Sequence, residues 1–181
     1  NMKVWIASDL HGSALYCRML LDAFAREGGD RLVLLGDLLY HGPRNDLPEG
    51  YDPKTVTALL NEAADRLFCV RGNCDAEVDQ MVLTFPIQAD SALLALDGLT
   101  IYATHGHLHS PEAPPPLRTG DILLCGHTHL PVDRDCGGFR YLNPGSLSLP
   151  KDGTPHSYMI LEDGSFTWRD LLTGRSFQPL A

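Results

Sequence analysis

Aspartate, histidine and asparagine side chains gather in five short motifs along this chain, and each motif follows an apolar run. The motifs are Asp9-Leu10-His11, Gly36-Asp37, Gly72-Asn73-Cys74-Asp75, His105-Gly106-His107 and Gly126-His127-Thr128-His129. Carboxylate, imidazole and amide groups are ligands of divalent metal ions, whereas a hydrophobic core has no use for them. The sequence therefore predicts a metal site that five separate segments build together.

Two pairs of such groups at positions i and i+2 stand out, one in the first motif and one in the last. Because successive side chains of an extended backbone point to opposite sides, Asp9 and His11 are expected to face the same way. The same spacing applies to His127 and His129. The glycines beside these motifs remove side-chain bulk where several loops must crowd together.

Taken singly, each motif also has a purely structural interpretation. Asp-x-His recurs by chance, Gly-Asp is commonly a turn, and Gly-Asn sequences favour turns as well. In an α/β sheet, however, ligands bind at the carboxyl ends of the strands, and every motif here falls at the end of an expected strand. This convergence favours one site over five unrelated turns.

The ligand types also restrict the metal. No cysteine cluster accompanies them, which disfavours a closed structural zinc site and favours manganese, iron, zinc or cobalt in an open catalytic site. The ligand groups outnumber what one protein-bound ion needs, so two ions bridged by a carboxylate fit better. Such ion pairs characteristically hold a phosphoryl group for in-line displacement.

The elements that must position these groups alternate between strand and helix in the first part of the chain. Strands are expected at residues 3–8, 31–35 and 67–70. Ser13 is expected to cap a helix whose apolar stripe runs from Leu15 to Phe24, and Asp52-Pro53 opens a second helix after a loop. This alternation predicts a parallel sheet with crossover helices.

After about residue 90 the pattern changes to hairpins. Asp97-Gly98, Gly137-Gly138 and Asp163-Gly164 each separate two apolar runs of strand length, which predicts a mostly antiparallel second half. Two sheets packed face to face, with helices outside, are the economical architecture. The length of 181 residues suits one domain that spans residues 1–181.

Composition excludes several classes of function. The formal net charge is −9, and no cluster of lysine and arginine suggests a surface that tracks a nucleic-acid backbone. No apolar run is long enough to span a membrane. Five scattered cysteines do not form a disulfide framework and favour a cytoplasmic location. Bound cations would still let an acidic protein take an anionic substrate.

The ordered set of motifs closely resembles the calcineurin-like metallophosphoesterases. The segments Gly36-Asp37, His41-Gly42-Pro43-Arg44-Asn45, Arg71-Gly72-Asn73-Cys74-Asp75 and Asn143-Pro144-Gly145-Ser146 resemble specifically the small bacterial YfcE-type phosphodiesterases. The resemblance covers nearly the whole chain. It implies an α/β fold, a four-layer α/β/β/α sandwich of two mixed sheets, with a dinuclear centre at the strand ends that is usually assigned as manganese, Mn(2+).

The resemblance also assigns ligands residue by residue. It places Asp9, His11 and His129 on the first ion, and Asn73, His105 and His127 on the second, with Asp37 as the bridge. Spacing alone does not choose between His105 and His107, and the family pattern selects His105. Imidazole ligands usually need a partner for their other ring nitrogen, and Asp75 is a candidate for that role.

The residue after Asn73 departs from the wider superfamily, which commonly has histidine where this chain has Cys74. That histidine is thought to help protonate the leaving group. A thiol, with an ordinary pKa near 8.5, matches neutral pH less well than imidazole does. Catalytic roles are expected for Asp37, Asn73, Cys74 and His105, and phosphate contacts for His41, Arg44 and Arg71.

The implied function is a metal-dependent phosphodiesterase, a phosphoric diester hydrolase, in which a metal-bridging hydroxide attacks phosphorus in line. The alternative is a protein-interaction scaffold of the type of retromer's Vps29, in which the metal site is altered; seven filled ligand positions weigh against it. A nuclease is disfavoured by the short chain and the missing basic surface. A small phosphodiester is the expected partner; no membrane is expected, and association into a homo-oligomer stays open.

Overall fold

The first sheet is built around the first strand of the chain. In the structure, a computed structural model that describes residues 1–181, β1 (Val4–Ala7) lies between β2 (Arg31–Leu34) and β9 (Ser157–Glu162). It is parallel to β2 and antiparallel to β9. The sheet continues with β3 (Leu67–Cys69) beyond β2, and with β10 (Ser165–Asp170) and β11 (Ser176–Phe177) beyond β9.

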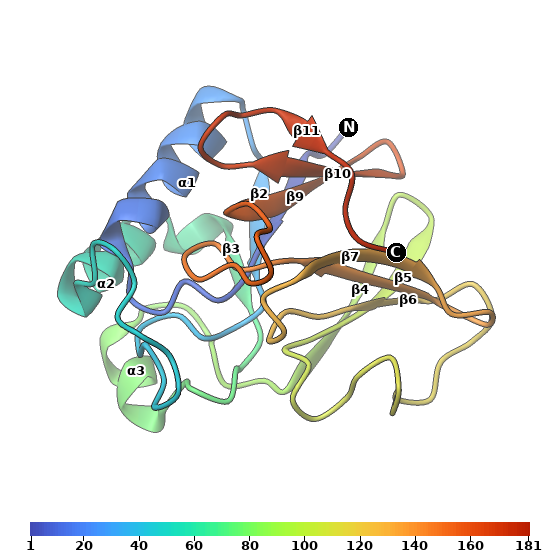
Figure 1. The fold of residues 1–181 in the computed structure, drawn as a ribbon, viewed down its shortest axis with the longest axis horizontal. Helices are drawn as coiled ribbons and strands as arrows, with labels where there is room; N and C mark the ends of the chain where they lie inside the picture. The colour runs from blue at the N-terminus through green and yellow to red at the C-terminus, as the bar shows by residue number, and fades with distance from the viewer.

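The second sheet packs against the first (Figure 1). Its strands follow the order β4-β5-β6-β8-β7. Their bounds are β4 (Ser91–Leu96), β5 (Leu99–Thr104), β6 (Ile122–Leu124), β7 (Pro131–Asp135) and β8 (Arg140–Pro144). The three expected hairpins are confirmed as β4–β5, β7–β8 and β9–β10. The prediction of a mostly antiparallel second half is only partly right, because β5, β6 and β8 run parallel to one another.

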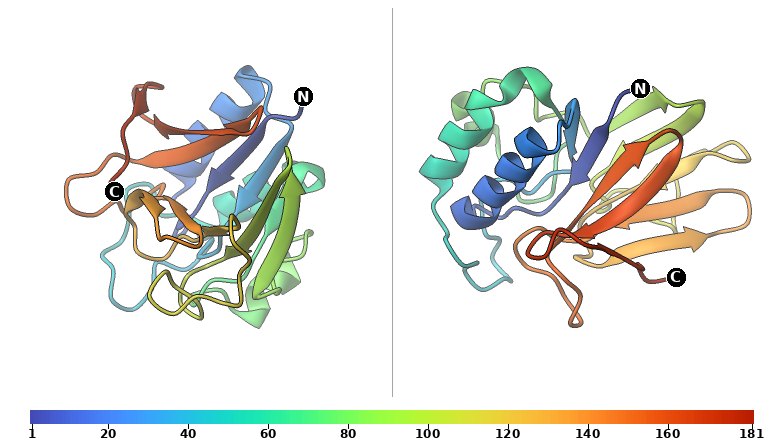
Figure 2. Two further views of the ribbon diagram at one scale, coloured as in Figure 1. Left: turned by 90° about the vertical axis from the view of Figure 1, so that its right-hand side faces the viewer. Right: turned by 90° about the horizontal axis from the view of Figure 1, so that it is seen from above.

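Helices cover the outer face of the first sheet, as Figure 2 shows from above. They are α1 (Ala14–Arg26) and α2 (Pro53–Glu62), which contact each other, and the short α3 (Glu77–Val82). Ser13 caps α1 by accepting a hydrogen bond from the backbone N–H of Tyr16. The expected stripe is shifted, because Leu15 is exposed and Tyr16 and Cys17 take its place in the core.

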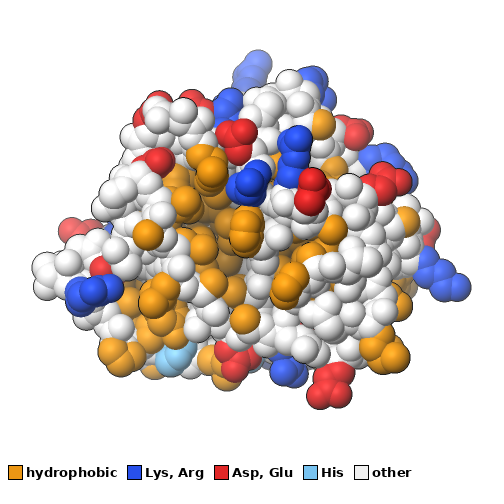
Figure 3. Space-filling view, turned by 180° about the vertical axis from the view of Figure 1, so that it is seen from behind, with side chains coloured by type: hydrophobic (Ala, Val, Ile, Leu, Met, Phe, Trp, Pro, Cys, Tyr) orange, Lys and Arg blue, Asp and Glu red, His pale blue; other side chains and the backbone are white.

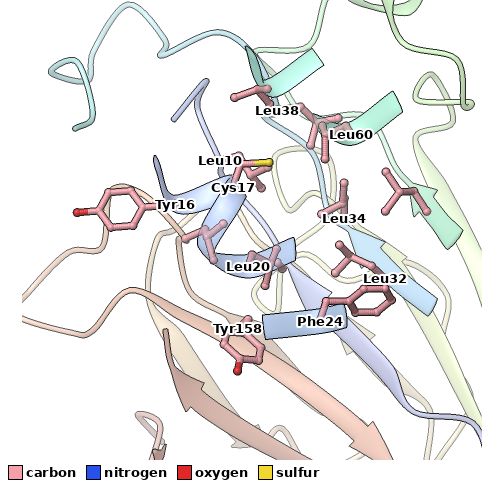
Figure 4. Close-up of a cluster of buried hydrophobic side chains, with 14 of the residues drawn as sticks. Leu10, Tyr16, Cys17, Leu20, Phe24, Leu32, Leu34, Leu38, Leu60 and Tyr158 are labelled. Atoms are coloured by element: carbon pink, nitrogen blue, oxygen red, sulfur yellow. The ribbon is translucent and has the colours of Figure 1, made fainter. Parts of the chain in front are cut away.

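The core under α1 is drawn in Figure 4. Leu20 and Phe24 of α1 pack there against Leu32 and Leu34 of β2. Trp5 of β1 lies in the same cluster and stacks on Tyr158 of β9, with ring centroids 4.6 Å apart. This packing fixes β1 and β2, and therefore the loops that follow them.

The outer face of the second sheet is covered by loop rather than by helix. Leu123 and Tyr141 pack there with Leu117, which belongs to the long connection between β5 and β6. The two mixed sheets confirm the expected sandwich, and the outer layer on this side is irregular chain. None of the helices is long and apolar enough to cross a membrane.

The open side of the sandwich, where β3 and β4 form the sheet edges, is apolar. Two neighbouring hollows of about 230 and 220 Å³ share Val33, Phe68 and Leu94 in their linings. Figure 3 shows hydrophobic side chains gathered in a depression on the face seen from behind. This groove lies between the strands and away from the polar loop ends described next.

Candidate metal centre

The five predicted motifs meet at one end of the two sheets. The motifs follow β1, β2, β3, β5 and β6, respectively. Because β1, β2 and β3 are parallel, their carboxyl ends lie along one edge, and the parallel pair β5 and β6 contributes the corresponding edge of the second sheet. The fold thus gathers side chains that lie far apart in the sequence.

Two buried carboxylates stand at the middle of this gathering, and each has one oxygen held by the protein. Asp9 Oδ2 accepts hydrogen bonds from Ser8 Oγ at 2.7 Å and from the backbone N–H of His127 at 2.9 Å. Asp37 Oδ1 accepts the backbone N–H of Cys74 at 2.8 Å. The other oxygens, Asp9 Oδ1 and Asp37 Oδ2, face the imidazoles.

Three imidazoles are oriented by backbone carbonyl groups. The Nδ1 atoms of His11, His105 and His129 lie 2.9, 2.6 and 2.7 Å from the carbonyl oxygens of Tyr40, Leu35 and Leu149. A carbonyl can only accept, so each Nδ1 carries the proton and each Nε2 presents a lone pair. The expectation that Asp75 is the hydrogen-bond partner of an imidazole ligand is therefore wrong for these three rings.

The Nε2 atoms and the free carboxylate oxygens of these residues converge. His11 Nε2 and His129 Nε2 lie 3.2 Å apart, and each lies 3.3 Å from Asp9 Oδ1. His105 Nε2 lies 3.2 Å from Asp37 Oδ2, and both Asp9 Oδ1 and His105 Nε2 are buried without a hydrogen-bond partner. Acceptors packed this closely need a cation among them. Two ligands about 2.1 Å from one ion lie roughly 3.0–3.4 Å apart, so the residues present fit a metal.

The side chains fall into two groups that a third, overlapping group connects. Ligand atoms of Asp9, His11 and His129 all lie within 4.8 Å of one another, and so do those of Asp37, His105 and His127. Asp37 also belongs to a third such set, with His11 and Cys74. Asn73 lies at the mouth of the same site, among the residues that line its cavity. The arrangement suits two ions with Asp37 between them.

Charge in the site is balanced within the cluster. Burial alone would raise the pKa of Asp9, but His105, His11 and His129 hold it well below its ordinary value of 3.8. Burial alone would lower the pKa of His105, but Asp9 and Asp37 raise it to about 9. Both carboxylates thus attract positive charge to their free oxygens, which is also what a metal ion would supply.

The backbone of the ligand residues is strained. Asp9, His11 and Asp37 have φ of 57°, 46° and 57°, and His127 and His129 have 71° and 61°. Non-glycine residues rarely adopt this left-handed region, and such residues cluster at functional sites. The expectation that both i, i+2 pairs lie on extended backbone is therefore wrong. Both side chains of each pair nevertheless reach the site.

Glycines allow the loops to approach one another, as expected. A Cβ on Gly72 would collide with Asp37 Oδ1, and a Cβ on Gly126 would collide with Ser8 Oγ and lie 2.8 Å from Asp9 Oδ2. Any larger residue at these two positions would displace a carboxylate of the cluster.

Asp75 holds two of the ligand loops together. Its carboxylate accepts backbone N–H groups from Gly72 at 2.7 Å, Asp37 at 2.9 Å and Leu38 at 3.0 Å. Burial raises the pKa of this carboxyl in spite of the three donors. The loop after β2 and the loop after β3 are therefore joined by a buried side chain that is not itself directed at the metal cluster.

A cavity of about 500 Å³ opens above the cluster. It is lined by His11, Asp37, Asn73, Cys74, His127 and His129 from the predicted set. Of the three predicted phosphate contacts, Arg44 lines this cavity, whereas His41 packs between Tyr40 and Tyr51, and Arg71 lies outside the lining. Lys151 also lines it. No sequence pattern points to Lys151, because only the folding of its loop over His129 brings it there.

His107 stays at the edge of the site. Its exposed ring lies 5.4 Å from the ring of His105 and 6.2 Å from that of His127, centroid to centroid. Burial and the neighbouring His105 lower its pKa. His105, by contrast, is fully buried and directed at Asp37, so the geometry favours His105 of the two as the ligand.

Comparisons with known proteins agree with this geometry. Phosphodiesterase YfcE of Escherichia coli (strain K12) is 51% identical over 162 residues, which cover 90% of this chain and 88% of that protein. The solved structure of E. coli YfcE, described as a phosphoesterase, superposes with a TM-score of 0.95 at 47% identity and covers 99% of both chains.

More distant structures share only the fold. Wild-type Vps29 of Entamoeba histolytica, solved in complex with zinc, superposes with a TM-score of 0.63 at 23% identity and covers 97% of this chain and 96% of that one. The model of the calcineurin-like phosphoesterase superfamily domain, in contrast, matches residues 2–164 of the sequence. Together with the relative that is 51% identical, this match shows that the chain belongs to the calcineurin-like phosphoesterase superfamily.

Proposed function

We propose that residues 1–181 form a single metallophosphoesterase domain that hydrolyses small phosphodiesters with the help of two divalent ions. The observation that carries this proposal is the convergence of imidazole Nε2 atoms on the free oxygens of two buried carboxylates, in two groups that the pair His11 and Asp37 connects. The activity named for the E. coli relative, a phosphodiesterase, supports the choice of diesters.

The ligand assignment follows the two groups. Asp9, His11 and His129 would hold one ion, and Asn73, His105 and His127 the other, with Asp37 shared. Manganese is the proposed metal, since this many imidazoles suit a softer ion than magnesium. When bound, the two ions would lower the pKa of a water molecule and neutralise charge that develops on the phosphoryl oxygens.

The protein's own residues would hold the metal ligands in position and contact the charged substrate. Ser8 Oγ and the backbone N–H of His127 hold the carboxylate of Asp9 in place by the hydrogen bonds already described. The backbone N–H of Cys74 does the same for Asp37. Arg44 would contact a phosphate oxygen of the substrate from the wall of the cavity. Water attacks phosphorus in line with the departing oxygen, and this single displacement inverts the configuration at phosphorus.

Cys74 occupies the position at which the wider superfamily commonly has a histidine. Its thiol lines the cavity beside Asp37, and burial together with the negative charge of Asp37 raises its pKa to about 12. A thiol, whose ordinary pKa is near 8.5, matches proton transfer at neutral pH less well than an imidazole does. We therefore propose that the enzyme favours diesters whose leaving group departs without a proton.

A scaffold of the Vps29 type is the less favoured alternative. The likeness to Vps29 is below 25% identity and shows a common fold alone, while all seven ligand positions of this chain carry suitable groups. Five free cysteines, two of them fully buried, support the proposed cytoplasmic location.

Hydrolysis of bis(4-nitrophenyl) phosphate tests the proposal. The purified protein should release nitrophenol, dialysis against a chelator should abolish the reaction, and Mn²⁺ should restore it better than Mg²⁺. Full activity in excess chelator would refute the two-metal assignment, and absence of turnover with every divalent ion would refute the activity.

A further inference from the structure

The cavity above the metal cluster carries more positive charge than a simple diester can use. Twelve residues line it, and only one of them is hydrophobic. Ligand pockets are usually lined mainly by apolar and aromatic side chains, which bury the organic part of a ligand. A cavity of about 500 Å³ with so polar a wall suits a ligand that is itself strongly charged.

Two cations in this wall have no carboxylate partner. Neither Arg44 nor Lys151 forms an ion pair, although the chain as a whole carries a net charge of −9. Both side chains are therefore available to an anion that enters the cavity. The neighbouring aspartates, Asp46 and Asp152, are exposed and make no ion pair with them.

Lys151 is fixed in place by a tight turn. Its backbone N–H donates to the carbonyl oxygen of His129 at 3.2 Å, and its own carbonyl accepts the N–H of Thr154 at 3.0 Å. Asp152 and Gly153 at the centre of the turn have φ of 55° and 72°, as a type I′ turn requires. The turn therefore presents the lysine directly beside a residue of the metal cluster.

Arg44 reaches the cavity from a different loop. Asn45 Nδ2 donates to the carbonyl oxygen of His41 at 2.9 Å and closes this loop. A Cβ on Gly42 would lie only 3.2 Å from Cys74 Sγ, so the loop packs directly on that residue. The guanidinium group is thus carried by a closed loop on the side of the site where Cys74 lies.

The charges can be counted. With two divalent ions, Asp9 and Asp37 leave a charge of about +2, and Arg44 and Lys151 raise it to about +4. A phosphodiester brings −1, whereas a phosphate monoester group adds about −2 near neutral pH. We propose that Lys151, with Arg44, selects phosphodiesters that carry a second phosphate group, as in a nucleotide ester with a terminal phosphate.

This inference rests on the proposed phosphodiesterase activity, so its test uses two substrates with one scissile bond. They are thymidine 5′-(4-nitrophenyl phosphate) and the same compound with an added 3′-phosphate, each assayed with Mn²⁺. The 3′-phosphate should raise kcat/KM by roughly fivefold or more, the effect of about one well-placed ion pair. The advantage should shrink at high ionic strength.

Variants assign the effect to the two cations. In Lys151→Gln and Arg44→Gln the ratio of kcat/KM between the two substrates should fall towards one, and Lys151→Glu should reverse it. Arg18→Gln, on the exposed side of α1, is the matched control and should keep the ratio of the unaltered protein.

The outcomes separate this inference from the activity on which it rests. Turnover of both substrates with equal kcat/KM would overturn the role of the second phosphate and leave the phosphodiesterase standing. An unchanged ratio in Lys151→Gln would overturn the assignment to that residue. Turnover of neither substrate, nor of bis(4-nitrophenyl) phosphate, would refute the activity itself.

Discussion

The carboxylate of Asp75 accepts the backbone N–H of Asp37 at 2.9 Å and so ties a metal-ligand loop to the loop that follows β3. Replacing Asp75 by asparagine turns one of its acceptor oxygens into a donor that faces backbone N–H groups. We expect Asp75→Asn to cost about 1–3 kcal/mol of unfolding free energy and to weaken Mn²⁺ binding, measured by denaturation and by calorimetry. Asp65→Asn, at an exposed position, is the control, and equal losses in both variants would contradict the role of Asp75.

Asp37 belongs to one ligand group and lies within 4.8 Å of His11 of the other, so it is the proposed bridge. In Asp37→Asn the amide oxygen can still accept the N–H of Cys74, so the fold should survive while the bridging charge is lost. Removal of a residue that only hydrogen-bonds to a metal ligand typically costs roughly 10–100-fold. In Asp37→Asn, turnover of a nitrophenyl diester should fall by more than this. His156→Ala is the comparison, because His156 stacks on Tyr16 away from the cluster. Normal turnover in Asp37→Asn together with a large loss in His156→Ala would disprove the site assignment.

The thiol of Cys74 should limit the range of leaving groups. Cys74→His supplies a proton donor, and general acid catalysis contributes about 10²–10⁴-fold where the leaving oxygen must be protonated. We therefore expect the variant to gain much more on alkyl diesters than on nitrophenyl diesters. Rates for leaving groups of graded pKa decide the question: a shallower slope for the histidine variant supports the role, and parallel lines remove Cys74 from the mechanism.

Buried thiols should make the fold sensitive to alkali. Burial raises the pKa of Cys17 from its ordinary value of 9.0 to about 12, so the unfolded chain ionises there before the folded chain does. The stability contributed by the neutral thiol is complete below pH 9 and is lost as the pH rises towards 12. Chemical denaturation at several pH values gives the unfolding free energy as a function of pH. Above pH 9 the slope of this dependence should be smaller in Cys17→Ala by up to about 1.4 kcal/mol per pH unit. The partly buried Cys136 offers Cys136→Ala as the comparison, and identical slopes in all three proteins would be the contrary result.

Much of the fold is predictable because its signals are local. Ser13 precedes an apolar helix, and Asp97-Gly98 lies between two strand-like runs, so the helix cap and the hairpin follow from a few neighbouring residues. The short helix α3 has no such signal. It is six residues long and buries none of its side chains, so it leaves no periodic pattern to detect.

The ligand residues could be predicted by type, but their surroundings could not. The partners of the ring nitrogens are backbone carbonyl groups of Tyr40, Leu35 and Leu149, and every residue carries a carbonyl. Left-handed φ values at Asp9 and His11 also contradict the extended backbone that their spacing suggests. Tertiary packing imposes both features, so neither is written in the local sequence.

The pairing of Val4 with Leu161 has a consequence for how this protein reaches its native state. Strand β1 gains its second neighbour only after β9 has been synthesised, although the last proposed metal ligand, His129, precedes β9 in the chain. Contacts between such distant parts of the chain slow folding. The nascent protein therefore holds the complete set of proposed ligands before the sheet that carries the first of them is complete.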